Sequence, residues 1–466
     1  MYSSNSKREI QLTRSFSLQP ADAWVVILSF AGITALLCFI GPGKPLNLLF
    51  PAGTSAVAFY LCTRYPILYL GFTWWVILLS PLVRRMADYQ SSFTDPSPIL
   101  LAPYLATLVG IVALGKYLPM VLSGGGRPYA FTLAGIIYAS LIGYINRSPV
   151  VAIIGALDYL CPVLFSLYIF TCWRLYPAVY KNLERVMIWG VLILGGYALY
   201  QYFGLPPWDQ FWLDNASINS LVVNATETTR IWSTLNSPEP FGTFMSMSLL
   251  MLFTADSGLR FVALPIGHLS LLVSLVRSSW VGWLGGILAL ITSVKPKVQM
   301  RLLMIILVMS FVVTFLALRE EFAEPITSRL DTFSDIEDDG SARARRSTFE
   351  SAVGVALTSF LGQGIGGSTF DNAFLSILIN MGWLGAIFYV GGAVLLAVKL
   401  FRGVENRYDP FIAVARAVVF SGLVRVPLNV VFSETNGFFF WAFLGAGLAA
   451  KNYYLNNQGN FQNKNS

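Results

Sequence analysis

Long apolar segments alternate with short polar ones along almost the whole chain. Stretches dominated by apolar residues recur from Trp24 to Ala450. An α-helix needs roughly 20 such residues to cross a bilayer, so the pattern predicts about 12 to 14 membrane-spanning helices. Because helices satisfy their own backbone hydrogen bonds in lipid, the expected fold class is an all-α polytopic integral membrane protein.

Two long polar segments divide the series of spans. Residues 1–203 hold the N-terminal spans, 204–240 form an external loop, and 241–318 hold the spans that include Arg277. Residues 319–371 form a large polar loop with an amphipathic stretch that predicts a helix, and 372–450 hold the last spans. The Asn- and Gln-rich residues 451–466 are expected to be a disordered tail. The spans are expected near residues 24–40, 46–62, 67–83, 100–115, 129–145, 150–173, 186–203, 241–253, 261–275, 281–294, 302–318, 372–399, 411–428 and 437–449.

Basic residues beside the apolar segments indicate the orientation. Lys7, Arg8 and Arg14 precede the first span, and cytoplasmic loops are enriched in Lys and Arg, so we expect a cytoplasmic N-terminus. Successive crossings then place the C-terminus in the cytoplasm and both long polar segments outside. The basic clusters that this orientation puts inside are Arg174, Lys181 and Arg185, then Lys295, Lys297 and Arg301, and finally Lys399, Arg402 and Arg407.

Composition agrees with a membrane protein. Of the 466 residues, 55% are hydrophobic and 12% are charged, whereas soluble domains carry about 25% charged residues. The net charge of +7 would suggest a nucleic-acid partner in a soluble protein, but here the basic residues flank apolar segments, so no nucleic acid is expected. The four cysteines lie in apolar runs without metal-ligand spacing and are interpreted as packing residues.

Several charged residues fall on the external side, and the arginines among them run against the charge rule. Arg84 and Arg85, with Asp88, follow a span on that side, and Glu434 lies beside another. Contact with lipid headgroups is the favoured interpretation of these groups, and contact with a sugar or phosphate is the alternative. The aromatic residues expected at the external membrane interface are Trp208, Trp212 and Trp232.

Four external arginines could bind an anion. Arg277 opens a span in SLVRSSWVGWLGG, where a charge needs a partner, a ligand or contact with headgroups. Arg230 precedes another span in TRIWSTLNSPEPFG, and an ordinary loop arginine is its alternative interpretation. Arg345 and Arg346 lie in the large loop. Arginine binds phosphate through a planar fork and stays charged.

A glycine-rich turn, LGQGIGG, precedes Asp371 and Asn372 at the start of a span. Such a turn can accept an anion through backbone amides, or it can be a tight connector. Asp371 can serve as a base or as a helix N-cap. Arginines and a carboxylate on one membrane face suit a pyrophosphate-bearing lipid donor and an acceptor hydroxyl that loses a proton. The pattern thus favours a glycosyl-transfer site.

At these residues the sequence resembles the bacterial O-antigen ligase and polysaccharide polymerase superfamily. The matching stretches are RIWSTLNSPEPFGTF, SLVRSSWVGWLGG and RRSTFESAVGVALTSFLGQGIGGSTFDNAFLSILINMGWLGAIFY. The resemblance covers residues 229–390, while the N-terminal half matches only in its pattern of spans. It implies a metal-independent glycosyltransferase of the GT-C class, without a cofactor, in the bacterial cytoplasmic (inner) membrane.

The resemblance also implies roles for these residues. Arg230 and Arg277 correspond to diphosphate-contacting arginines, and Arg346, with Arg345 as the alternative, to the arginine of the loop helix. The substrate would be an undecaprenyl-pyrophosphate-linked oligosaccharide on the periplasmic side, with a flippase and a chain-length regulator as possible partners. Ligases of the family carry His-Asn where this chain has Asp371-Asn372, so a polymerase is favoured over a ligase.

Two other classes of function stay open. A solute transporter would carry ionisable residues at mid-bilayer, for which Asp158, Arg416 and Arg425 are the candidates. A structural component of a polysaccharide assembly would need no intact site. The Asp371-Asn372 pair at the start of the span, called the lip motif below, differs from that of the ligases and permits this class. The presence of the arginines argues against it. His268, the only histidine, lies in an apolar span and is interpreted as structural.

Overall fold

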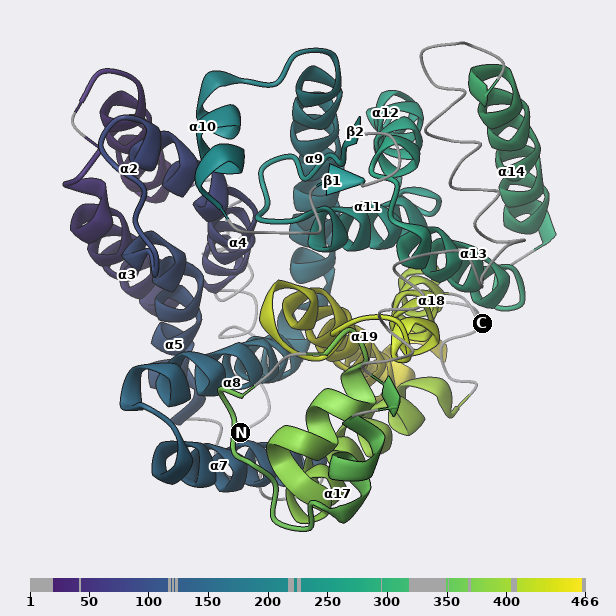
Figure 1. The fold of residues 1–466 in the computed structure, drawn as a ribbon. Helices are drawn as coiled ribbons and strands as arrows, with labels where there is room; N and C mark the ends of the chain where they lie inside the picture. The colour runs from purple at the N-terminus through teal and green to yellow at the C-terminus, as the bar shows by residue number, and fades with distance from the viewer. Residues whose placement is uncertain are drawn as a thin grey trace.

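The computed structural model is a bundle of packed helices (Figure 1). It describes residues 20–41, 43–115, 119, 121, 125–216, 222–223, 228–294, 296–317, 349–350, 352–367, 370–403 and 409–462. The first half contains α2 (Ala21–Phe39), α3 (Leu46–Arg64), α4 (Pro66–Tyr89), η1 (Pro98–Leu101), α5 (Ala102–Leu114), α7 (Arg127–Asn146), α8 (Pro149–Thr171), η3 (Trp173–Leu175), α9 (Tyr176–Phe203) and α10 (Pro207–Asn215).

The second half begins with a two-residue hairpin. β1 (Val222–Val223) pairs antiparallel with β2 (Thr228–Thr229). The helices that follow are α11 (Pro238–Leu252), α12 (Arg260–Val273), α13 (Arg277–Ile291), α14 (Pro296–Ala317), α17 (Ala373–Phe401), α18 (Pro410–Arg425) and α19 (Glu434–Gln462).

Every predicted span coincides with a helix. Seven helical segments in the described part of the chain are long and apolar enough to cross a membrane, and they include α2, α4, α8 and α17. The prediction of a multi-pass helical membrane protein is therefore confirmed. One detail is wrong: α19 stays helical to Gln462, where the composition indicated a disordered tail.

The outer surface of the bundle is apolar. On α2 the exposed fractions of Val25, Leu28 and Phe39 are 62%, 61% and 63%, and Leu307 and Phe311 of the peripheral α14 are similarly exposed (Figure 1). Large contiguous apolar surface is unusual for a soluble monomer. These faces fit contact with lipid chains.

Helix packing depends on small residues at close contacts. α7 and α17 run side by side (Figure 1), and a Cβ added to Gly135 would lie 2.7 Å from the carbonyl oxygen of Gly385. A Cβ added to Gly392 would lie 2.2 Å from Oγ1 of Thr132. Close backbone approach through small residues is typical of membrane helices. A larger side chain at either glycine would push the two helices apart.

Contacts between helix ends show the alternation of the spans. At one end of the bundle, Lys399 Nζ donates to the carbonyl of Gly125 at 2.9 Å, and Tyr176 donates to Asp409 at 2.6 Å. All four residues lie at helix ends that the charge pattern assigns to one side. The ends assigned to the other side also meet one another, and they form the candidate site.

Candidate functional site

The site is built around the turn between α18 and α19, residues 426–433. The carbonyl of Val426 accepts a hydrogen bond from the backbone amide of Ala373 at 3.0 Å. The side-chain amide of Asn372 donates to the carbonyl of Pro427 at 3.4 Å. The turn therefore holds the N-terminal end of α17, where the predicted lip residues lie.

The same turn contacts two more helix N-termini through Asn429. Its side-chain nitrogen donates to Ser278 Oγ of α13 at 2.8 Å and to Glu239 Oε1 of α11 at 2.6 Å. Asn436 of α19 donates to the other carboxylate oxygen of Glu239. Four helix N-termini, those of α11, α13, α17 and α19, thus meet at the C-terminus of α18.

Glu239 is the central acceptor of this cluster. It lies in the first turn of α11, where the helix dipole favours a negative charge, and it also accepts from Thr243 at 3.2 Å. Burial raises the pKa of the Glu239 carboxyl, the positive charge of Arg425 lowers it, and the negative charge of Asp371 raises it. The last effect places Asp371 within electrostatic range of Glu239.

Arg425 is a fully buried cation at the end of α18. Its exposed fraction is 0%, and Nη1 donates to Thr243 Oγ1 at 2.5 Å. Gly282 of α13 leaves room for the side chain, since a Cβ there would lie 2.6 Å from Cδ of Arg425. The nearby negative charge of Glu239 partly compensates the buried positive charge. A buried cation of this kind depends on such compensation.

Arg277 is the first residue of α13, directly before Ser278 of the cluster. It is partly buried. The N-terminus of α13 adds its own partial positive charge to that of the side chain. The arrangement is therefore suited to an anion.

Asp371 and Asn372 have different structural roles. The side chain of Asn372 accepts from the backbone amide of Leu375 at 3.0 Å and caps α17. Asp371, one residue earlier, is exposed. The interpretation of Asp371 as the N-cap is therefore wrong, since Asn372 fills that position. The assignment of Asn372 to substrate binding stays a prediction.

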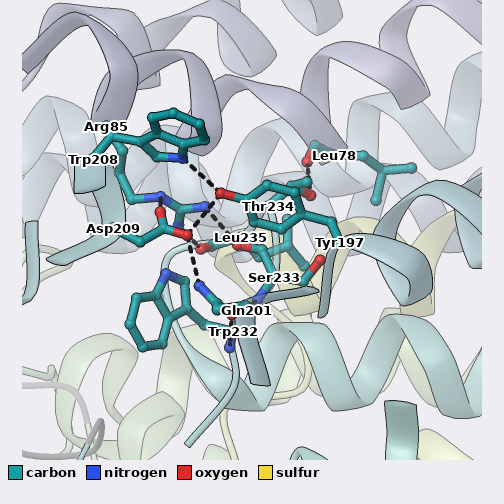
Figure 2. A network of polar contacts seen from close by, with 10 residues as sticks. All are labelled: Leu78, Arg85, Tyr197, Gln201, Trp208, Asp209, Trp232, Ser233, Thr234 and Leu235. Atoms are coloured by element: carbon teal, nitrogen blue, oxygen red, sulfur yellow. Dashed lines mark hydrogen bonds and ion pairs between the residues drawn. The ribbon is translucent and has the colours of Figure 1, made fainter. Parts of the chain in front are cut away.

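Arg230 is partly buried just before the segment that leads to Glu239. That segment, residues 231–236, is held by a buried polar network around Arg85 (Figure 2). Arg345 and Arg346 lie outside the described residues. Among the predicted arginines, Arg277 directly precedes Ser278, which accepts a hydrogen bond from Asn429 of the cluster.

The network around Arg85 consists of an ion pair and its supports. Arg85 of α4 and Asp209 of α10 lie 2.8 Å apart, and both side chains have an exposed fraction of 0%. Tyr197 and Gln201 of α9 donate to Asp209 at 2.7 and 2.9 Å (Figure 2). The guanidinium carbon of Arg85 lies over the ring of Trp212, 5.7 Å from the ring centroid. Headgroup contact, the favoured interpretation of Arg85, is therefore wrong.

This network fixes the chain that precedes α11. Arg85 donates to the carbonyls of Ser233, at 2.5 Å, and Leu235. Gln201 accepts from the amide of Ser233 at 2.9 Å, and Thr234 donates to the carbonyl of Leu78 at 2.7 Å (Figure 2). Arg85 therefore acts as a positioning group for the approach to Glu239. Trp212 and Trp232, expected at the membrane interface, are also buried here.

The glycine-rich turn is a connector packed against a kink in α17. The amides of Gln363 and Gly364 donate to the carbonyls of Ile379 and Asn380 at 2.8 and 2.9 Å. These carbonyls lie just before Gly382, whose φ of 65° breaks the helix. Because these two backbone amides already donate to carbonyls of α17, the tight-connector interpretation is favoured over anion binding by this backbone.

An apolar groove of about 300 Å³ opens beside the lip. It lies between α17, the α18–α19 turn and the helical residues 349–350 and 352–358. Its lining is almost wholly apolar and ends at Asn372. The groove residues are Phe349, Val353, Ala356, Leu357, Asn372, Phe374, Leu375, Leu378, Val426 and Pro427.

Sequence reasoning missed Glu239, Asn429 and Asn436 as site residues. One local signal was present for Glu239: it stands between Pro238 and Pro240, and proline favours a helix start, where the helix dipole stabilises a carboxylate. Asn429 and Asn436 carried no such signal, because their partners lie far away in the chain. Among the described residues, no group of three or more His, Cys, Asp or Glu is arranged to hold a metal ion.

No protein-family model matches the chain, and no curated protein matches it either.

Proposed function

We propose that the protein is a membrane glycosyltransferase that joins undecaprenyl-pyrophosphate-linked oligosaccharide repeats on the periplasmic face of the cytoplasmic membrane, as a polysaccharide polymerase. The observation that carries the proposal is the convergence of Arg277, Asp371 and Glu239 at one end of the bundle, around one turn. A cation, an exposed carboxylate and an apolar groove are the parts that such a reaction needs.

In the proposed reaction the donor's pyrophosphate binds beside Arg277, where the α13 N-terminus adds to the positive charge. The acceptor sugar hydroxyl attacks the anomeric carbon of the donor sugar. The bond from that carbon to the pyrophosphate oxygen breaks, and undecaprenyl pyrophosphate leaves with the bonding electrons. Asp371 takes the hydroxyl proton as general base. Electrostatic stabilisation of the leaving pyrophosphate is the main contribution of Arg277.

Glu239 is assigned a positioning role in this proposal. Both of its carboxylate oxygens accept hydrogen bonds from the protein, from Asn429 and from Asn436. Asp371 is exposed, whereas Glu239 is partly buried. Asp371 is therefore the better placed of the two to accept a proton from a substrate. Glu239 joins the helices that carry Arg277 and Asp371.

The experiment uses purified protein in vesicles with undecaprenyl-pyrophosphate-linked oligosaccharide as the only substrate. The proposal predicts products that lengthen by whole repeats, and their loss in Arg277→Ala. Arg64→Ala, an exposed arginine at the far end of α3, is the matched control. Intact starting material with the wild-type protein under all conditions would reject the proposal.

Two alternatives remain, and they differ in what they predict. A ligase of the same superfamily would transfer the glycan to another acceptor, so single transfers would replace lengthening. A solute transporter is favoured by one observation, the interacting carboxylates of Asp158 and Glu434 inside the bundle. A transporter would leave the lipid-linked oligosaccharide unchanged in the vesicle experiment.

A further inference from the structure

A second, polar pocket of about 210 Å³ lies on the other side of α17 from the apolar groove. It is enclosed by α8, the glycine-rich turn, α17 and the start of α19. Its polar lining comes from Asp158, Tyr159, Asn380, Ser433 and Glu434. None of these residues has a part in the reaction proposed above.

The carboxylates of Asp158 and Glu434 and the side-chain oxygen of Asn380 are hydrogen-bond acceptors in this pocket, beside the hydroxyl groups of Tyr159 and Ser433. Asp158 accepts a hydrogen bond from Tyr104, and its carboxylate lies within electrostatic range of Glu434. Asn380 has an exposed fraction of 3%, and its side-chain nitrogen donates to the carbonyl of Ser376 at 2.8 Å. Its Oδ1 has no hydrogen-bond partner within the described ranges. Buried polar atoms are normally paired, so an unpaired oxygen beside a pocket points to a ligand donor.

Two further features mark the pocket as a formed site. A Cβ added to Gly367 would lie 2.8 Å from Oδ1 of Asn380, so the glycine leaves that oxygen open to the pocket. Glu434 has a φ of 55°, in the left-handed region that residues other than glycine seldom adopt. Backbone held in this way is frequent at binding sites.

The chemistry of the lining selects among ligand classes. The carboxylates of Asp158 and Glu434 disfavour phosphate. The nearby Arg147, whose Nη2 would lie 3.0 Å from a Cβ added to Gly367, donates to Gln363 at 3.3 Å. The polar atoms disfavour a lipid chain, for which the apolar groove is better suited. A ligand rich in hydroxyl donors satisfies both the carboxylates and Oδ1 of Asn380.

We propose that this pocket, formed by Asp158, Asn380, Glu434 and Gly367, binds one sugar ring of the oligosaccharide through its hydroxyl groups. The inference rests on the proposed function and specifies its substrate contacts. α17 then separates two environments, with the groove for an apolar chain on one face and the sugar pocket on the other. Asp371 precedes the helix between them, where the reacting hydroxyl would lie.

The test is saturation-transfer NMR with the full chain in nanodiscs and a panel of methyl glycosides of common neutral hexoses, deoxyhexoses and N-acetylhexosamines. At least one glycoside should bind the wild type. Asp158→Asn removes a charged acceptor and should weaken that binding by about tenfold or more. Gly367→Leu should abolish it by filling the pocket next to Asn380, a prediction that does not depend on Asp158.

Two controls separate this inference from the proposed function. Asp256→Asn changes an exposed carboxylate between α11 and α12 and should leave glycoside binding unchanged. Arg277→Ala should also bind the glycoside while failing to lengthen the lipid-linked substrate. The sugar pocket would be overturned if the wild type bound no glycoside. It would also be overturned if the folded variants Asp158→Asn and Gly367→Leu bound the glycoside as tightly as the wild type. Lengthening by the wild type in that case would leave the proposed function standing.

Discussion

The side-chain amide of Asn429 donates to Glu239 Oε1 at 2.6 Å, although 190 residues separate the two. The same nitrogen reaches Ser278, the neighbour of Arg277, at 2.8 Å. The side-chain amide of Asn429 therefore bridges the start of α11 and the start of α13. The position of Arg277 depends on this contact rather than on local sequence.

The first prediction concerns the compensation between Glu239 and Arg425. Glu239→Ala leaves the guanidinium of Arg425 buried without its nearby negative charge, which should cost about 3–5 kcal/mol. In the double variant Glu239→Ala/Arg425→Leu no buried charge remains, so part of that loss should be recovered. Chemical denaturation of the detergent-solubilised protein measures the three free energies of unfolding. Strictly additive losses would mean that the two charges do not interact.

The second prediction concerns the network around Arg85. Arg85→Ala or Asp209→Ala breaks a fully buried ion pair, and each should lower the free energy of unfolding by about 3–5 kcal/mol. The control is Arg64→Ala, because Arg64 is exposed and lies over the ring of Tyr60 in a cation–π pair. Its cost should stay below about 1 kcal/mol. Similar losses for Arg85→Ala and Arg64→Ala would refute the structural role of Arg85.

The third prediction uses two glycines of the same helix. Gly382 has a φ of 65°, and a Cβ there would lie 2.3 Å from the amide nitrogen of Gly362. Gly382→Ala should therefore destabilise the protein and displace the turn that leads to Asp371. Gly391→Ala is the matched control, since nothing lies within 4 Å of its added Cβ, and alanine should stabilise the helix by up to about 1 kcal/mol.

Thermal unfolding in detergent, together with protease cleavage in the glycine-rich turn, distinguishes these two variants. We expect a lower Tm and faster cleavage for Gly382→Ala alone. Equal behaviour of Gly382→Ala and Gly391→Ala would show that the kink does not depend on glycine.

The sequence predicted those features that depend on local pattern. The long apolar runs located each span, and the charge clusters predicted which helix ends lie together, whereas α10 lies in a segment that was expected to be a loop. Arg277 and Asp371 were identified because both stand at the start of an apolar segment. Their connection through Asn429 and Glu239 could not be predicted, since it joins residues from separate helices.

Two errors have the same physical origin. Arg85 follows an apolar segment, a position typical of contact with headgroups, but its partner Asp209 lies on α10, in the loop between later spans. Trp212 and Trp232 were assigned to the interface from their place in a polar loop, whereas the loop folds back over Arg85. Local composition cannot reveal such long-range pairing.

The most direct test of the central claim is the length distribution of lipid-linked oligosaccharide and surface polysaccharide in cells whose only copy carries Arg277→Ala or Asp371→Asn. With membrane levels of the protein matched, loss of an electrostatic contact to the leaving group should slow transfer by about 10²–10³-fold. Single repeats should therefore accumulate without long chains, while Arg64→Ala and Asp256→Asn cells keep the normal distribution. Long chains of normal abundance in the Arg277→Ala and Asp371→Asn cells would contradict the proposed site.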